Sequence, residues 1–118
     1  MASLSKAWPW PDSLDAVTAA PEHHVVLYEN DRVRVLDTLI RPGCRTPLHT
    51  HRWAMTMYVL SWSDFVRIDE HGKVVNDSRL SPARSNASAV MWSEPMPPHV
   101  LENVGTVQLR VISVELKQ

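Results

Sequence analysis

The chain has 118 residues, of which 44% are hydrophobic and 21% are charged, and its formal net charge at pH 7 is −1. These values predict a single globular domain with its own core, and they give no reason to expect nucleic acid or a membrane surface as a partner. The single cysteine, Cys44, excludes an intramolecular disulfide and is typical of a reducing, cytoplasmic compartment.

Residues 1–21 are predicted to form an arm and a short helix that precede the main domain. Two Trp-Pro pairs within residues 8–11 favour extended backbone, because a residue before proline is disfavoured in the helical region. The next segment, DSLDAVTAA, predicts a helix that Asp12 or Ser13 caps and that Pro21 ends. The N-terminus lacks the apolar run of a signal peptide, and no segment has the length and apolarity expected of a transmembrane helix.

Residues 22–118 are predicted to form an all-β domain. Short runs rich in Val, Leu, Ile, Tyr and Trp alternate with turn residues, and no helical pattern separates them. Gly72 in the DEHGK segment predicts a hairpin turn, since glycine accepts a positive φ readily. So many short strands need two sheets packed face to face, in a sandwich or a barrel. The predicted strands are 25–29, 32–40, 48–53, 55–62, 64–69, 73–79, 88–93, 99–103 and 107–117.

Two histidines at the start of a predicted strand are candidate metal ligands. In His49-Thr50-His51 the histidines lie two residues apart, so on a strand both side chains project from the same face. His99 lies in the MPPHVLEN segment, at the start of another predicted strand. Imidazoles from neighbouring strands can converge on one divalent ion and leave coordination positions open. The alternative for the pair is two polar residues at a solvated strand end.

The spacing of these histidines resembles the two sequence motifs of the cupin superfamily. Gly43 is followed by five residues and then by His49-Thr50-His51, as in the first motif. The segment from His99 to Asn103 matches the His-x-x-x-Asn end of the second motif. The resemblance covers residues 22–118 and implies a double-stranded β-helix, or jelly-roll, barrel that binds one divalent metal ion. It implies that the metal ligands are His49, His51 and His99.

The chain departs from the first motif at the position of its usual acidic ligand. Met55 stands where the superfamily has glutamate, and Trp62 stands where it has glycine. A thioether is a soft ligand, so Met55 is interpreted as part of the pocket wall. The three remaining imidazoles are neutral, which leaves a divalent ion its full charge and strengthens its polarisation of a bound substrate. Such three-histidine sites resemble those of the thiol dioxygenases and of a diketone-cleaving dioxygenase, which use Fe(II).

Several further residues are candidates for binding a substrate. Besides Met55, they are three aromatic residues and one arginine of the last predicted strand: Trp53, Tyr58, Trp92 and Arg110. Core packing is the alternative role for the aromatic residues. An inward arginine needs a carboxylate partner or an anionic ligand, and Arg110 is preferred over Arg34 and Arg67 because apolar residues surround it. The other histidines are interpreted as surface residues: His23, His24 and His71.

The resemblance favours a small metal-binding cupin, with iron as the preferred metal and zinc, manganese, nickel or copper as alternatives. Three functions stay open: an Fe(II)-type dioxygenase acting on a small oxygen- or thiol-bearing molecule, a metal-dependent isomerase or hydrolase, and a non-catalytic module that binds a small molecule. The nearest acids, Glu94 and Glu102, are not placed convincingly as a general base, which disfavours the hydrolase.

The arm also predicts a homodimer. Trp8 and Trp10 have little core around them, and each large apolar side chain left in water forgoes ~1.5–3 kcal/mol of burial. A two-sheet barrel keeps exposed edge strands, which a second copy would cover. Folding of the arm onto its own barrel is the alternative.

Overall fold

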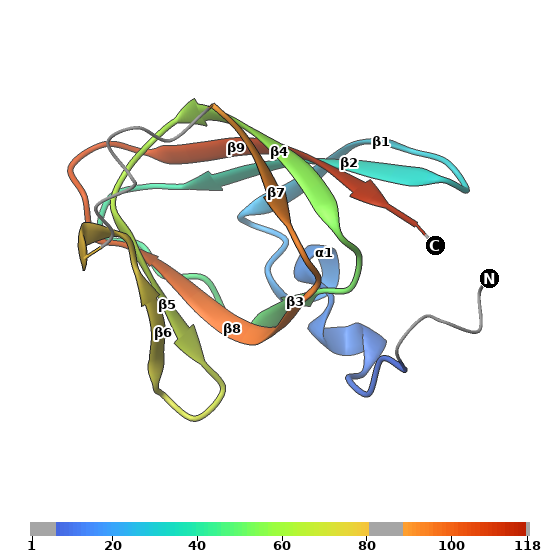
Figure 1. Cartoon of the computed structure of the whole chain (residues 1–118), viewed down its shortest axis with the longest axis horizontal. Helices are drawn as coiled ribbons and strands as arrows, with labels where there is room; N and C mark the ends of the chain where they lie inside the picture. Colours follow the sequence, from blue (N-terminus) through green and yellow to red (C-terminus); the bar gives the residue numbers. More distant parts are fainter. Residues whose placement is uncertain (1–6, 81–88, 118) are drawn as a thin grey trace.

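The computed structural model describes residues 7–80 and 89–117, and these residues form two antiparallel sheets that face each other (Figure 1). The strands are β1 (His24–Glu29), β2 (Val33–Ile40), β3 (His49–His51), β4 (Met55–Ser61), β5 (Phe65–Asp69), β6 (Val74–Asp77), β7 (Val90–Ser93), β8 (Met96–Asn103) and β9 (Leu109–Leu116). One sheet has the order β1-β2-β9-β4-β7, and the other has the order β3-β8-β5-β6. The all-β prediction is confirmed, with strand bounds that shift by no more than three residues.

Alternation along the strands sorts side chains between the barrel interior and the outer surface. Strand β2 pairs with β9 without a break, from Val33 opposite Leu116 to Ile40 opposite Leu109. Every second residue of β2 points inward, and Leu36 and Ile40 have no exposed surface. Every second side chain of β4 and β9 also points inward, so the five-stranded sheet forms one wall of the interior.

Asn103, the last residue of β8, forms side-chain hydrogen bonds where the two sheets meet. Its amide nitrogen donates to the carbonyl oxygens of Ile40 at 2.8 Å and Val107 at 2.9 Å. Its side-chain oxygen accepts from Ser63 Oγ at 2.8 Å and from the Gly105 amide at 2.9 Å. Because Asn103 is 1% exposed, these four bonds satisfy a side chain that would be costly to bury alone. Its role is therefore to join the two sheets.

The segment before the barrel contains two short helical turns, η2 (Asp12–Leu14) and α1 (Ala16–Ala19). The residue that caps α1 is Asp15, so the predicted capping by Asp12 or Ser13 is wrong. Asp15 adopts extended backbone between the turns, and its carboxylate accepts from the Val17 amide at 3.3 Å. Neither turn, nor any other helix in the described part of the chain, is long and apolar enough to cross a membrane.

The described part of the arm lies beside its own barrel. Trp8 and Trp10 pack edge to face, with ring centroids 4.7 Å apart and planes at 72°. Trp8 also borders a groove of about 270 Å³ that Trp53 and Arg34 line from the barrel side. Both tryptophans are half-buried within the single chain, so part of their surface is still available to a partner.

The two edge strands of the five-stranded sheet expose apolar side chains. On β1 these are Val25, Leu27 and Tyr28; on β7 and its neighbour β4 they are Val90, Trp92, Tyr58 and Leu60. Unpaired strand edges with apolar side chains favour association with another chain.

We therefore predict a homodimer in which the arm takes part. Deleting residues 1–11 is expected to shift the protein from dimer towards monomer, because the deletion removes both tryptophans from the interface. Mass measured by light scattering at micromolar concentration tests this. A truncated chain that stays fully dimeric, or a monomeric full-length chain, contradicts the prediction.

Candidate metal centre

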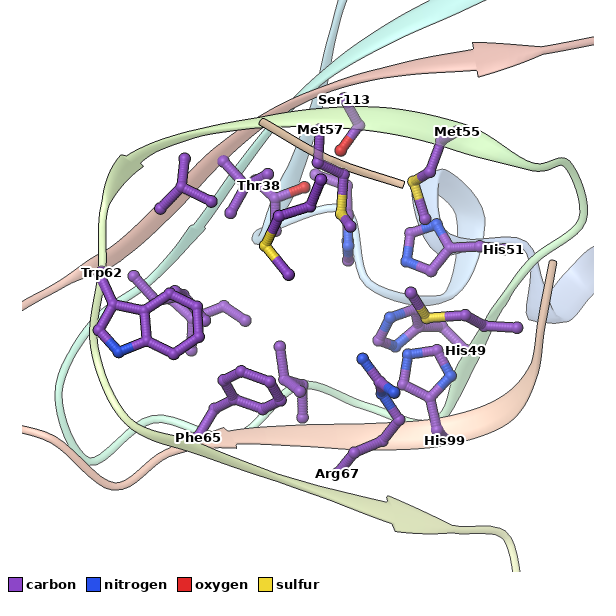
Figure 2. Close-up of a pocket in the computed structure, with 18 residues that line it drawn as sticks. Thr38, His49, His51, Met55, Met57, Trp62, Phe65, Arg67, His99 and Ser113 are labelled. Atoms are coloured by element: carbon purple, nitrogen blue, oxygen red, sulfur yellow. The ribbon is translucent and has the colours of Figure 1, made fainter. Parts of the chain in front are cut away.

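The three predicted ligands come together inside the barrel. His49 and His51 lie on β3, and His99 is the cross-strand partner of His49 on β8. The ring centroids of His49 and His99 are 4.4 Å apart, and those of His51 and His99 are 5.7 Å apart. Figure 2 shows the three rings facing one another at one side of the cavity. All three are buried, at 1%, 7% and 4% exposure for His49, His51 and His99.

A fourth histidine, His24, joins them from the opposite sheet, so its interpretation as a surface residue is wrong. Its ring centroid lies 4.9 Å from that of His49 and 5.3 Å from that of His51, and its exposure is 3%. One ring nitrogen from each of His24, His49 and His51 lies within 4.8 Å of the other two, close enough for the three to hold a metal ion. His99 is not one of these three, although its ring centroid lies 4.4 Å from that of His49.

His24 points inward because it is the first residue of β1 and pairs with Thr38, another inward residue, on β2. A register shift between Val26 and Tyr28 breaks the alternation of β1, so the sequence pattern of this strand does not reveal its phase. One feature of the sequence did point to another ligand. Met55 replaces the usual glutamate ligand, so a ligand from elsewhere in the chain could take the vacant position.

Each of the four imidazoles has a hydrogen-bond acceptor beside Nδ1. A carbonyl or carboxylate oxygen can only accept, so Nδ1 carries the proton and Nε2 keeps its lone pair. This tautomer leaves Nε2 available to bind a metal, and the acceptor also fixes the orientation of the ring. The acceptors are the Ala20 carbonyl for His24 at 3.0 Å, the Pro47 carbonyl for His49 at 2.8 Å, the Pro97 carbonyl for His99 at 2.8 Å and the Glu115 carboxylate for His51 at 3.4 Å.

Burial keeps these imidazoles neutral. Loss of solvation, together with the neighbouring histidines, lowers the pKa of His24 and His51 to about 3 and that of His99 to about 2. Burial also lowers the pKa of His49 below its usual value. At neutral pH the cluster thus offers uncharged nitrogen donors, which is the state that binds a divalent cation.

A buried ion-pair network lies behind His51. Glu115, with no exposed surface, accepts from Arg34 Nε at 2.5 Å and holds His51 with its other oxygen. The two terminal nitrogens of Arg34 bind the Asp15 carboxylate, each at 2.9 Å. Burial alone would raise the pKa of Asp15, but the hydrogen bond and charge of Arg34 lower it below its usual value. Arg34 is therefore an inward arginine with carboxylate partners, and the network positions one histidine of the cluster.

The histidines border a cavity of about 120 Å³ whose other walls are mainly apolar. Figure 2 shows Trp62 and Phe65 across the cavity from the histidines, with Met55 and Met57 on the β4 side. Apart from the histidines, the only titratable residue among the described ones that line the cavity is Arg67. The cavity therefore has a polar side with the histidines and an apolar side with the aromatic rings.

Of the predicted substrate-binding residues, Met55 lies in the cavity wall and is 2% exposed. Trp53 lies outside the cavity, in the groove beside Trp8, with its ring 5.0 Å from the guanidinium carbon of Arg34. Tyr58 and Trp92 do not reach the cavity either, and they are 51% and 55% exposed. Since Met55 and Met57 point inward on β4, alternation turns Tyr58 to the outer face.

Arg110 also faces outward. It lies between Leu109 and Val111, which both line the cavity, so alternation turns its side chain away from the interior. Its guanidinium binds the Asp37 carboxylate on the outer face at 2.8 Å and 3.1 Å. The arginine that does line the cavity is Arg67 on β5, which the sequence alone did not single out.

Comparison with known proteins supports the fold. No protein-family model and no curated protein matches the sequence. A cupin domain from Bordetella pertussis Tohama I is similar in structure, with a TM-score of 0.62, 18% identity, and coverage of 80% of this chain and 92% of that one. A conserved protein with a double-stranded β-helix domain from Klebsiella pneumoniae has a TM-score of 0.56, 20% identity, and coverage of 80% and 73%.

The polyketide cyclase RemF from Streptomyces resistomycificus is also similar, with a TM-score of 0.53, 20% identity, and coverage of 88% of this chain and 72% of that one. At such identities the likeness concerns the fold. The chain thus has the cupin double-stranded β-helix fold that its two histidine motifs imply, and three of its buried histidines lie close enough together to hold a metal ion.

A variant of His24 tests whether the fourth histidine is a ligand. His24→Gln is expected to weaken Zn(II) binding at least about tenfold, because it removes one nitrogen donor from the cluster. The matched control is His71→Gln in the exposed hairpin turn, which should bind as tightly as the unmodified protein. Isothermal titration calorimetry measures both. Unchanged affinity in His24→Gln would limit the ligand set to His49, His51 and His99.

The depressed histidine pKa values also predict how the metal-free protein responds to acid. Below pH ~6.5 the unfolded chain takes up protons that the folded chain refuses down to pH ~3, so stability falls as the pH falls through this window. The expected slope is ~1.4 kcal/mol per pH unit for each buried histidine, with no histidine contribution above the window.

Urea unfolding of the metal-free protein at several pH values between neutrality and pH ~5 measures this slope, because an unperturbed imidazole titrates within this range. His24→Gln should reduce the slope by ~1.4 kcal/mol per pH unit, which corresponds to one proton fewer taken up on unfolding. His71→Gln should leave the slope unchanged. A stability that does not vary over this range would disprove the prediction.

Proposed function

We propose that the protein is a metal-dependent oxygenase that acts on a small molecule held in the barrel cavity. The observation that supports this most is the composition of the cavity wall. Four neutral histidines face a space in which no described lining residue is an acid, a lysine, a tyrosine or a cysteine. If the histidines bind a metal ion, no other lining residue is left to act as a general base, so the bound ion has to supply the reactivity.

The residues present fit a divalent metal. Imidazole nitrogen suits iron, zinc, copper and nickel, and the tautomers set by the Nδ1 acceptors leave Nε2 free on all four rings. We infer iron as the preferred metal, with zinc, manganese, nickel or copper as alternatives. When bound, Fe(II) supplies the capacity to activate dioxygen.

The protein's own residues hold and shield the substrate. Trp62 and Phe65 pack edge to face, with ring centroids 5.7 Å apart, and with the methionines they keep this side of the cavity apolar. A cavity of about 120 Å³ has room for roughly five or six non-hydrogen atoms, since a cavity of ~150 Å³ holds benzene, which has six. The substrate class is then a small oxygen- or thiol-bearing molecule.

A second candidate function is a non-catalytic module that binds a small molecule, and the methionines favour it. Met55, Met57, Met91 and Met96 all line the cavity, and thioethers are readily oxidised to sulfoxides. An oxidising site surrounded by methionine sulfur risks damage to its own wall. An isomerase or hydrolase has less support, because the lining residues that the structure describes include no carboxylate.

Metal reconstitution followed by oxygen-consumption measurements separates these functions. The protein loaded with Fe(II) under anaerobic conditions is expected to consume dioxygen when mixed with small 1,3-diketones or thiols, and the Zn(II)-loaded protein is not. His51→Gln should abolish consumption because it removes a ligand, and His71→Gln should retain it. Binding of these compounds without oxygen consumption, for every redox-active metal, would favour the binding module.

A further inference from the structure

Arg67 is a half-buried cation with no ion-pair partner in the described part of the chain. Its Nε atom is buried and has no hydrogen-bond partner. Its guanidinium carbon lies 5.8 Å from the centroid of the Phe65 ring. Burial lowers the pKa of Arg67 below its usual value, with no carboxylate to offset the effect. Arg34, by contrast, is satisfied by two carboxylates.

The position of Arg67 directs it at the metal side of the cavity. Phe65 and Arg67 lie two residues apart on β5, so both project to the interior. Arg67 pairs with Leu101 on β8, one inward position along from His99. Figure 2 shows its guanidinium in the cavity, close to the rings of His49 and His99. Arg67 and His99 also line an outer groove of about 370 Å³, so Arg67 stands between the cavity and the surface.

Once a divalent ion is bound, the charges of this region do not balance without an anion. Arg67 contributes +1 and the neutral histidines contribute nothing, while the network behind His51 has one arginine and two carboxylates and contributes −1. A divalent ion would then leave a net charge of about +2 around a small cavity with no carboxylate in its wall. A half-buried cation without a partner is costly, and an anionic ligand removes that cost.

We propose that the cavity binds a small monocarboxylate, with the carboxylate on Arg67 and the apolar end against Trp62 and Phe65. A planar guanidinium can bind a carboxylate through two parallel hydrogen bonds, which a neutral amide cannot match. This inference rests on the proposed function only in one respect: any further polar atoms of the ligand would lie at the histidines. It names the substrate class of the same site. The volume of the cavity limits the ligand to a short chain.

Binding of matched acids and amides to the Zn(II)-loaded protein tests the proposal. Propionate and butyrate are expected to bind about tenfold more tightly than propionamide and butyramide, as measured by calorimetry. Arg67→Gln should abolish this preference, and Arg67→Lys should keep part of it because it keeps the charge without the planar fork. The matched control is Arg110→Gln, which removes one positive charge from the outer face and should leave the preference unchanged.

The outcomes also distinguish this inference from the proposed oxygenase function, because zinc supports binding without redox chemistry. A carboxylate preference that depends on Arg67, together with no oxygen consumption by the Fe(II) protein, would leave the inference standing and refute the oxygenase. A preference that survives in Arg67→Gln and disappears on metal removal would overturn the inference, because the ion alone would then hold the carboxylate.

Thermal unfolding without ligand provides an independent readout of Arg67. Since its guanidinium has no ion-pair partner in the described part of the chain, Arg67→Gln should unfold at the same temperature as the unmodified protein or higher. Propionate should raise the unfolding temperature of the unmodified protein and of Arg110→Gln, and it should not raise that of Arg67→Gln. A marked loss of stability, or failure to fold, in Arg67→Gln would assign Arg67 a structural role and overturn the proposal.

Discussion

Burying four imidazoles in their neutral form is the constraint on which the site depends. An imidazolium in this interior would be poorly solvated and would face other histidines, so each ring stays uncharged. A neutral ring still has one N–H to satisfy, and in every case an oxygen acceptor lies beside Nδ1. One ring nitrogen from each of His24, His49 and His51 lies within 4.8 Å of the other two, so one metal cation can bind all three at once. The polar interior and the capacity to bind metal are thus two consequences of one arrangement.

The same arrangement joins the two sheets. His24 comes from β1 in the five-stranded sheet, while His49, His51 and His99 come from β3 and β8 in the four-stranded sheet. The Glu115 carboxylate on β9 adds another link, since it contacts both His51 and Arg34. An ion held by this cluster would connect strands of both sheets, so metal binding and folding stability are expected to be coupled.

Local sequence patterns predicted the strands and three of the histidines, and the residues they missed share one physical cause. His49 and His51 could be assigned because i and i+2 residues project together whatever the rest of the chain does. The inward positions of His24 and Arg67 depend on which face of β1 and β5 meets the other sheet. In β1 a register shift breaks the alternation, so the sequence does not show which residues point inward. For the arginines, the apolar neighbours of Arg110 led to its being preferred over Arg67 as the inward residue. The inward positions of His24 and Arg67 are set by long-range strand pairing, which local alternation in the sequence cannot reveal.

The division of the cavity into two sides restricts how a ligand can lie. A ligand with its apolar end at the histidines would leave Arg67 without a partner and would press a polar head against Trp62 and Phe65. The reverse orientation pairs each end with a wall of matching polarity. In the space available, a short ligand placed this way brings its oxygen-bearing end to the nitrogen donors and to Arg67 together. The polarity of the walls, more than any single contact, would therefore fix the orientation of such a ligand.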